Sequence, residues 1–418
     1  MIPITKPNIG EEEVQAAAQA LRSGWVSQGP RVAEFEQSFA ALVGAPYACA
    51  VSSCTTALHL ALLAVGVQPG DQVITVSHSF IATANSIRYC GALPVFVDIE
   101  PDTFNLDPSR LESAITERTK AILCVHQMGM PCDLARITAI AARHGLPVIE
   151  DAACAIGSEI RIGETWERIG KPHGDIACFS FHPRKVITTG EGGMLTTRNP
   201  EWDAQFRLLR QHCMSVPDTK RHASAEVIFE GYPAVGYNYR MTDLQAAVGC
   251  EQLKRLPEIV DKRRELAAHY QALLAPIAGL VLPQEPEWAR SNWQSYCVRL
   301  PEGMDQKRIM QILLDAGVAT RRGIMCSHRE SAYPADAWTC AARLKSRCDC
   351  TRDACAELPQ SEKAQDDGIV LPLFPQMMDH EQRQVAEALQ RALDNEQPRR
   401  LPHDPEGADL SISTMRQD

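Results

Sequence analysis

The feature that most constrains the fold is an alternation of short apolar runs with segments of helical periodicity, from residue 10 to about 200. Strands that are apolar on both faces are typical of a mostly parallel sheet covered by helices on each side. The pattern therefore predicts an α/β domain of the doubly wound type, whose ligands bind at the carboxyl ends of the strands. The apolar runs are Gln72–Val76, Pro94–Asp98, Ala121–Val125, Pro147–Glu150, Asp175–Phe181 and Gly193–Thr197.

The rest of the chain predicts a second domain. At roughly 150 residues per domain, 418 residues allow two or three domains. We predict a large domain over residues 1–254, a smaller mixed α and β domain over 255–395, and a disordered tail over 396–418, which has almost nothing to bury. Residues 332–367, rich in charge, Cys and Pro, predict a long excursion. The later elements are a helical pair from Met241 to about Leu274, a strand at Ser295–Leu300, and helices near Lys307–Ala316 and His380–Leu393.

The charge balance limits the classes of partner. The chain has 42 basic and 52 acidic side chains and a net charge of −10, which argues against binding to nucleic acid or to an anionic membrane. A local pocket can still be basic and accept an anionic small substrate. The longest apolar stretch, Leu58–Val67, is too short to span a bilayer, and the first residues do not resemble a secretory signal. We expect a soluble, cytoplasmic protein.

The 15 cysteines predict free thiols. They are scattered from Cys49 to Cys355, whereas disulfide frameworks belong to short secreted chains. Cys348, Cys350 and Cys355 are clustered, but the pattern CDCTRDAC lacks the paired C-x2-C motifs of structural zinc. We therefore predict no metal site and assign these cysteines to a surface excursion as reduced thiols.

The segment Phe179–Gly193, FSFHPRKVITTGEGG, contains the first candidate catalytic residue. A strand ends at Phe181, a turn carries His182 and Pro183, and Lys185 follows directly. A lysine held just past a strand end can be desolvated and become a nucleophilic amine that forms a Schiff base. The alternative is a solvated lysine in a surface loop.

Two further segments place polar groups after strands. Asp151 ends the apolar run that precedes Ala152 and Ala153, where its carboxylate suits a protonated pyridine nitrogen. The alternative role is a helix N-cap. The segment Val51–Leu58, VSSCTTAL, joins a strand end to a helix start, where hydroxyls and free N–H groups can bind a phosphate. Simple capping is again the alternative.

Together these segments supply a phosphate cradle, an acid for a ring nitrogen and a Schiff-base lysine, which pyridoxal 5′-phosphate (PLP) requires. On these motifs the chain resembles the DegT/DnrJ/EryC1/StrS aminotransferases, the sugar aminotransferase group of the fold-type I PLP enzymes. The resemblance extends to residue 395 and is densest before about 255. Its segments are SGWVSQGP, GDQVITVSHSFIATANSI, PVFVDIEPDTFNLDP, EDAACAIG, FSFHPRKVITTGEGGM, GYNYRMTDLQAAVG and IVLPLFPQM.

The resemblance implies a role for individual residues. Lys185 resembles the Schiff-base lysine, and Asp151 resembles the partner of the pyridinium nitrogen. Thr55 and Ser180 resemble the phosphate contacts. Phe80 lies in the region that supplies the aromatic residue over the ring face.

Two cysteines depart from the family pattern beside the cofactor. Cys54 stands where many relatives have Gly, and Cys154 stands where many have His or Gln beside the ring oxygen. A thiol is a weak hydrogen-bonding group, so the contact of Cys154 to that oxygen is in doubt.

Asn238, in GYNYRM, resembles the asparagine that reaches the phosphate of the neighbouring subunit's cofactor. This match implies a homodimer with sites at the interface. The alternative is that Tyr237, Tyr239 and Met241 pack in the core while Asn238 caps the next helix.

The resemblance implies transfer of an amino group from glutamate or glutamine to a keto sugar, usually a nucleotide-linked keto-deoxysugar aminated at C3 or C4. Lys185 would serve as Schiff base and as general base. Arg321, Arg322 and His328, in TRRGIMCSH, are candidates to meet a nucleotide diphosphate, although adjacent arginines also occur on solvated surfaces.

Three rival functions remain open at this point. PLP-dependent sugar dehydratases resemble the chain but have His in place of the lysine, so Lys185 favours transamination. Another fold-type I reaction, such as lyase or racemase chemistry, is a second alternative. A non-catalytic regulatory protein of this fold is the third, yet the sequence has neither a helix-turn-helix motif nor a basic patch.

Overall fold

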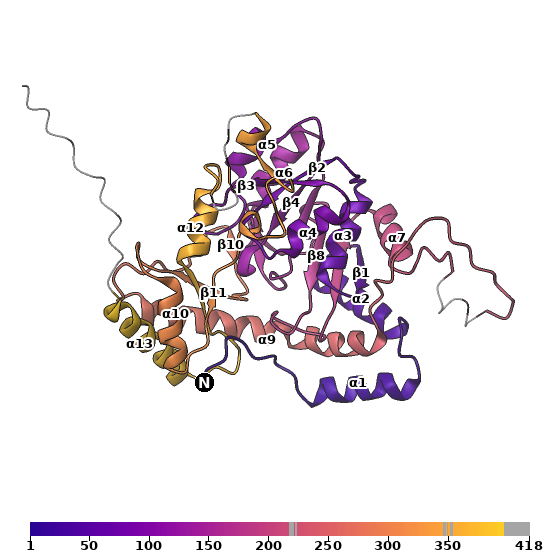
Figure 1. The fold of residues 1–418 in the computed structure, drawn as a ribbon. Helices are drawn as coiled ribbons and strands as arrows, with labels where there is room; N and C mark the ends of the chain where they lie inside the picture. Colours follow the sequence, from indigo (N-terminus) through magenta and orange to yellow (C-terminus); the bar gives the residue numbers. More distant parts are fainter. Residues whose placement is uncertain (217–220, 222–223, 346–347, 349, 352–353, 397–418) are drawn as a thin grey trace, which may run out of the picture.

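A sheet of eight strands forms the centre of the molecule, in the order β1-β9-β8-β5-β4-β2-β3-β13 (Figure 1). The computed structural model describes residues 1–216, 221, 224–345, 348, 350–351 and 354–396. Neighbouring strands are parallel except where β9 pairs with β1 and β8. The predicted α/β class is confirmed. The strands are β1 (Tyr47–Val51), β2 (Gln72–Val76), β3 (Leu93–Val97), β4 (Thr119–Val125), β5 (Val148–Asp151), β8 (Ile176–Ser180), β9 (Gly193–Thr197) and β13 (Thr339–Cys340).

Helices cover both faces of this sheet. Successive residues of β1 alternate between two hydrophobic clusters, Ala48 and Ala50 in one and Cys49 and Val51 in the other. Because side chains alternate across a strand, the two clusters lie on opposite faces. The first cluster includes α2 (Pro30–Val43), α6 (Leu134–Arg143) and α9 (Asp243–Leu274), and the second includes α3 (Cys54–Ala64) and α7 (Pro200–Leu209). The other helices of this part are α1 (Glu11–Ser23), α4 (Ala82–Tyr89), α5 (Leu111–Ala114) and the 3₁₀ turns η1 (Pro108–Arg110) and η2 (Gln127–Gly129).

Asp243 connects two distant segments of the chain. From the first turn of α9, its carboxylate accepts hydrogen bonds from the N–H groups of Gly29 at 2.7 Å, Val32 at 3.0 Å and Arg31 at 3.1 Å. These groups lie at the start of α2, where N–H groups have no partner within the helix. One side chain therefore caps α2 and fixes α2 against α9.

The C-terminal part has its own hydrophobic cluster, which combines the second half of α9 with a three-stranded sheet. The sequence predicted two helices from 241 to 274, but α9 continues through Pro257. Pro257 is exposed, while Leu256 and Ile259 beside it are buried, so packing outweighs the missing N–H group. This part contains β11 (Tyr296–Arg299), β14 (Gly368–Leu371), β12 (Arg321–Arg322), α10 (Gln306–Asp315), η3 (Ser327–Arg329) and α13 (Asp379–Asn395).

The predicted domain boundary at residue 254 falls inside α9, so this helix joins the two parts (Figure 1). The division therefore stays a prediction. Of the predicted tail, residues 397–418 lie outside the described residues. A separate small sheet consists of β10 (Ala289–Arg290), β6 (Glu159–Ile162) and β7 (Thr165–Arg168). Within the described part of the chain, no helix is both long and apolar enough to cross a membrane.

The described residues of the excursion at 332–367 are joined to the main sheet. Its strand β13 pairs in parallel with β3 at the edge of the main sheet, and Trp338 and Cys340 are fully buried. The expectation of reduced thiols in a surface excursion is wrong for one pair, because Cys348 and Cys350, two residues apart, form a disulfide. The excursion also contains α11 (Ala341–Leu344) and α12 (Pro359–Asp367).

Candidate active site

The carboxyl ends of β1, β2, β4, β5 and β8 open onto one cavity of about 390 Å³. The far wall comes from β12 and β14 of the C-terminal part. Because parallel strands end at the same edge of a sheet, residues far apart in the sequence meet here. The predicted site residues that line the cavity are Cys54, Thr55, Phe80, Asp151, Cys154, Ser180, Lys185, Arg321 and Arg322.

The N-terminus of α3 forms one end of the cavity. Ser53 is the N-cap, and its hydroxyl accepts a hydrogen bond from the N–H of Thr56 at 3.2 Å. Cys54 and Thr55 begin the helix, where backbone N–H groups have no acceptor within the helix. Ser180, at the end of β8, lines the same cavity. This arrangement suits an anion, because the helix dipole and the N–H groups favour negative charge.

Gly193 lets β9 approach this helix start closely. A Cβ atom at Gly193 would lie 2.4 Å from the carbonyl carbon of Ser53 and 2.7 Å from the backbone nitrogen of Cys54. Both contacts are with backbone, which cannot rotate away. The last glycine of the GEGG turn is therefore needed for the shape of the cradle.

Asp151 is a buried carboxylate at the end of β5. Burial raises the pKa of Asp151, while hydrogen bonds from Thr83 Oγ1 at 2.8 Å and from the N–H of Ala153 at 3.2 Å lower it in part. The positive charge of Lys185 also lowers this pKa. A cationic ring nitrogen bound beside Asp151 would also lower the pKa of this carboxyl group and keep it ionised.

Lys185 lies in the turn after β8, where its N–H donates to the carbonyl of His182 at 2.8 Å. Its Nζ lies 3.1 Å from Cys154 Sγ. Burial lowers the pKa of Lys185, but the sulfur of Cys154 and the carboxylate of Asp151 raise it, and the net shift is upward. The amine that the sequence singled out therefore faces the cavity between a thiol and a carboxylate.

Two residues that support the site were missed by the sequence analysis. Thr83, on α4, donates to Asp151, and no strand-end signal marks it. His126 follows β4 directly, so the strand-end argument used for Asp151 applied to it as well. Its Nδ1 accepts from the N–H of Cys132 at 2.9 Å, which leaves Nε2 to donate to the buried carboxylate of Glu150 at 2.9 Å.

The remaining predicted residues occupy three kinds of position. Phe80 lines the cavity and is 61% exposed, so its ring is free to cover a bound group. Arg321 and Arg322 line the cavity from β12, and both are exposed, with Arg322 paired to Glu330 at 3.1 Å. The structure does not bring His328 to the cavity, because it is buried against Ser77 and Glu362.

Asn238 lies outside the cavity, on the exposed segment that precedes α9, where it pairs with Gln211. Of the alternative considered for this segment, Met241 is buried in the core, whereas Tyr237 and Tyr239 are only partly buried and stack on each other with ring centroids 4.9 Å apart. Asn238 is not the cap of α9, because Thr242 takes that position.

The donor set of this cavity fits PLP. A helix N-terminus with adjacent hydroxyls suits its phosphate, the buried carboxylate of Asp151 suits its ring nitrogen, and the primary amine of Lys185 suits its aldehyde. Ser180, Asp151 and Lys185 would hold the group from the strand ends.

Known proteins are similar to this chain over most of its length. SpsC, a spore coat polysaccharide biosynthesis protein of Bacillus subtilis (strain 168), is 43% identical over 317 residues, which are 75% of this chain and 80% of that protein. The structure of Spr1654 from Streptococcus pneumoniae in its PMP form has a TM-score of 0.84 at 28% identity and covers 94% of this chain and 99% of that one. Spr1654 has also been solved in a PLP form.

A third similar structure is that of DesI. DesI, solved in the presence of its TDP-sugar product, has a TM-score of 0.79 at 31% identity, with 93% of this chain and 92% of that chain covered. The model of the DegT/DnrJ/EryC1/StrS aminotransferase family matches residues 7–390. The chain therefore belongs to the DegT/DnrJ/EryC1/StrS aminotransferase family and is a PLP-dependent enzyme.

Proposed function

We propose that this aminotransferase moves the amino group of glutamate or glutamine to C3 or C4 of a nucleotide-linked keto-deoxysugar. The observation that carries the proposal is one cavity with Lys185 and Asp151 on one wall and Arg321 and Arg322 on the other. In a chain of net charge −10, a basic wall facing the reactive amine suits an anionic acceptor. The TDP-sugar product in whose presence the related DesI was solved supports a nucleotide sugar as the acceptor class.

The roles of the residues follow from their positions. When bound, PLP supplies an aldehyde carbon that takes up the amino group and a ring that delocalises the electron pair released at the donor's α-carbon. Lys185 Nζ would hold the cofactor through that carbon and would act as the general base that accepts the proton of the donor's α-carbon. Asp151 would keep the proton on the ring nitrogen, while Thr55 and Ser180 would hold the phosphate. The same residues would serve the transfer of the amino group to the keto sugar.

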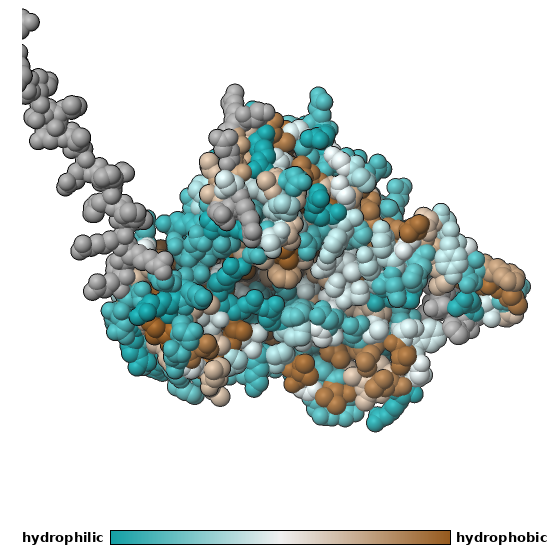
Figure 2. Space-filling view, viewed as in Figure 1, coloured by the Kyte–Doolittle hydropathy of each residue, from teal (hydrophilic) through white to brown (hydrophobic). Residues whose placement is uncertain are grey.

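We also propose a homodimer in which Asn238 reaches the cofactor phosphate of the neighbouring subunit. Asn238 follows an arm of described residues 224–237, and Figure 2 shows apolar atoms at the right end of the molecule, where this arm lies. Val227, Phe229 and Val235 on this arm are 86%, 91% and 86% exposed. Exposed apolar side chains of this kind mark contact surfaces, and a second copy of the chain would cover them.

We also propose a role for each predicted domain and a cellular location for the enzyme. Residues 1–254 would bind PLP, and residues 255–395 would carry Arg321 and Arg322 to the acceptor. We place the enzyme in the cytoplasm, since 13 of its cysteines are free and such thiols are kept reduced there.

Two measurements test the amino-transfer chemistry. Glutamate should bleach the absorbance of the holoenzyme near about 420 nm. Lys185→Ala should lack that band and lose turnover by about 10²-fold or more, whereas the exposed Lys171→Ala should keep both. Retained turnover in Lys185→Ala would show that Lys185 is neither the Schiff-base lysine nor the general base.

The acceptor class needs a separate screen. Purified enzyme and glutamate are incubated with nucleotide 3-keto and 4-keto sugars, and mass spectrometry detects the amino sugar. Bleaching by glutamate together with turnover only of cyclitol ketones or free sugars would contradict the nucleotide-sugar acceptor but leave the aminotransferase chemistry intact.

A further inference from the structure

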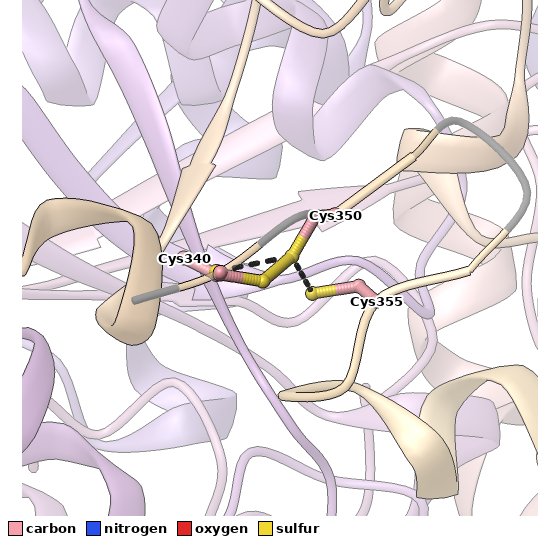
Figure 3. A group of neighbouring side chains, drawn as sticks. Cys340, Cys350 and Cys355 are labelled. Carbon is pink, nitrogen blue, oxygen red and sulfur yellow. Dashed lines mark hydrogen bonds between the residues drawn. A yellow bond between two sulfur atoms is a disulfide. The ribbon is translucent and has the colours of Figure 1, made fainter. Parts of the chain in front are cut away.

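Four cysteines outside the active site converge in space. The Sγ atoms of Cys340, Cys348, Cys350 and Cys355 all lie within 4.8 Å of one another. Figure 3 shows the side chains of Cys340, Cys350 and Cys355 pointing toward a common centre, with the disulfide of Cys350 between them. The motif CDCTRDAC contains only the last three cysteines of this group, and it predicted no metal site. Cys340, the missing ligand, is brought to the group by the pairing of β13 with β3.

We propose that these four cysteines, in their reduced form, bind one structural Zn²⁺ ion. Zinc takes four thiolates at about 2.3 Å in a tetrahedron, which places the sulfurs about 3.8 Å apart. In the structure, Cys350 Sγ lies 3.6 Å from Cys340 Sγ and 2.8 Å from Cys355 Sγ. Shifts of about 1 Å therefore convert the group into a zinc tetrahedron. The sulfurs are too close together for a cluster of several irons, in which each iron binds thiolates of its own.

The surroundings of the group are those of a structural site. Cys340 and Cys355 are 0% and 3% exposed and belong to a hydrophobic cluster with Phe96 and Trp338, whereas Cys348 and Cys350 cover it from outside. Four bound thiolates give the zinc site an excess of negative charge. Arg343 offsets it, because its guanidinium lies 4.6 Å from the Trp338 ring and donates to the carbonyl of Cys350 at 2.6 Å.

The binding of Zn²⁺ by the four thiols involves proton release but no electron transfer. Four thiols bind Zn²⁺ through four new Zn–S bonds and release four protons. The Cys348–Cys350 disulfide is two electrons more oxidised than this state, so a thiol or phosphine reductant must first open it. The other 13 cysteines of the chain are free, which is typical of a protein kept in a reducing compartment.

The ion would hold the excursion against the rest of the enzyme. β13 contributes only two residues to the sheet edge, which is too little pairing to fix the excursion on its own. The N–H of Cys355 donates to Glu362 at 2.7 Å, Glu362 accepts from His328 Nε2 at 3.1 Å, and His328 Nδ1 bonds Ser77 at 2.7 Å. Ser77 directly follows β2, so this chain of contacts runs from the cysteines to the strand ends of the active site.

The test begins with the metal content of the holoenzyme. The protein is expressed without a histidine tag, purified with a phosphine reductant and analysed for zinc, iron and sulfide. We expect one zinc per chain, and exchange with Co²⁺ should give the visible bands of tetrahedral thiolate coordination. A chain that stays free of zinc after reduction and incubation with Zn²⁺ would overturn the proposal, and so would iron with sulfide in place of zinc.

Variants assign the ion to this group. Cys348→Ser together with Cys350→Ser should reduce the zinc content from one per chain to background. These two side chains are only partly buried, so the variant should fold, and its PLP absorbance checks that it does. Cys90→Ser, at a buried cysteine outside the group, is the matched control and should keep its zinc. Zinc retained in the double variant, or lost equally in Cys90→Ser, would refute the assignment.

Discussion

Lys185 Nζ donates a hydrogen bond to Cys154 Sγ at 3.1 Å, so a thiol is a direct partner of this amine. Burial lowers the pKa of Lys185, whereas the sulfur and the carboxylate of Asp151 raise it above its usual value. In this enzyme, the proton affinity of the amine therefore depends on a cysteine.

Cys154→Ala should lower the pKa of Lys185, because it removes a group that raises it. Only the neutral amine attacks the aldehyde of PLP, so the variant apoenzyme should take up PLP at lower pH than the wild type does. The rate of reconstitution, followed by absorbance across a pH series, measures the shift. Cys90→Ala serves as the control, and a pH profile unchanged in Cys154→Ala would contradict this role of the sulfur.

Thr83→Val should weaken PLP binding through Asp151. The threonine hydroxyl donates to Asp151 at 2.8 Å and lowers its pKa, so the variant carboxylate takes up a proton at higher pH than the wild-type carboxylate does. A hydrogen bond to a charged group contributes about 1.5–3 kcal/mol, which corresponds to a PLP dissociation constant raised about 10- to 100-fold. The acidic limb of the activity profile should also move to higher pH. Thr83→Ser, which keeps the hydroxyl, should restore both properties.

Gly193→Ala should destabilise the cradle at the start of α3. Its Cβ would lie within 2.4 Å of the Ser53 backbone, and overpacking of this kind costs about 1–3 kcal/mol. We expect a lower Tm and weaker PLP binding in thermal denaturation with and without cofactor. At Gly231, the nearest neighbour of an added Cβ would be Ser215 Oγ at 3.9 Å, so Gly231→Ala should leave the Tm unchanged. Equal stability of the two variants would disprove the steric argument.

The sequence predicted the central fold well, because buried parallel strands have a strong local signal. The expected strand at Gln72–Val76 is exact, and the run at Asp175–Phe181 differs from β8 (Ile176–Ser180) by one residue at each end. Short edge pairings carry no such signal. β13 has two residues, and only its contact with β3 makes it a strand.

The sequence predicted Asp151, which ends β5, and Lys185, in the turn after β8, and the structure places both in the cavity. It missed His126 although this residue directly follows β4, and it had no signal for Thr83, which comes from a helix. Thr83 reaches Asp151 from α4, a contact that depends on packing between distant segments. The prediction of His328 as a site residue was wrong. It is close to Arg321 along the chain, but its side chain is buried away from the cavity.

Arg321→Ala should separate the two halves of the reaction. Arg321 lines the cavity from β12, opposite Lys185, where the proposed nucleotide diphosphate would lie. The loss of a charge-assisted contact of about 1.5–3 kcal/mol should raise the KM for the nucleotide keto sugar about 10- to 100-fold. The rate at which glutamate bleaches the cofactor should stay unchanged, because that half-reaction involves no nucleotide. Stopped-flow absorbance and steady-state kinetics measure the two quantities on the same preparation.

The matched control for this experiment is Arg308→Ala, on the exposed face of α10, where the guanidinium pairs with Glu396 instead of facing the cavity. Arg308→Ala should change neither the KM for the nucleotide keto sugar nor the rate at which glutamate bleaches the cofactor. If Arg321→Ala slows both half-reactions equally, the arginine serves the cofactor or the amino donor, and the basic wall no longer argues for a nucleotide. A raised KM with unchanged bleaching assigns Arg321 to the acceptor, because only a residue that contacts the acceptor alone changes one half-reaction and not the other.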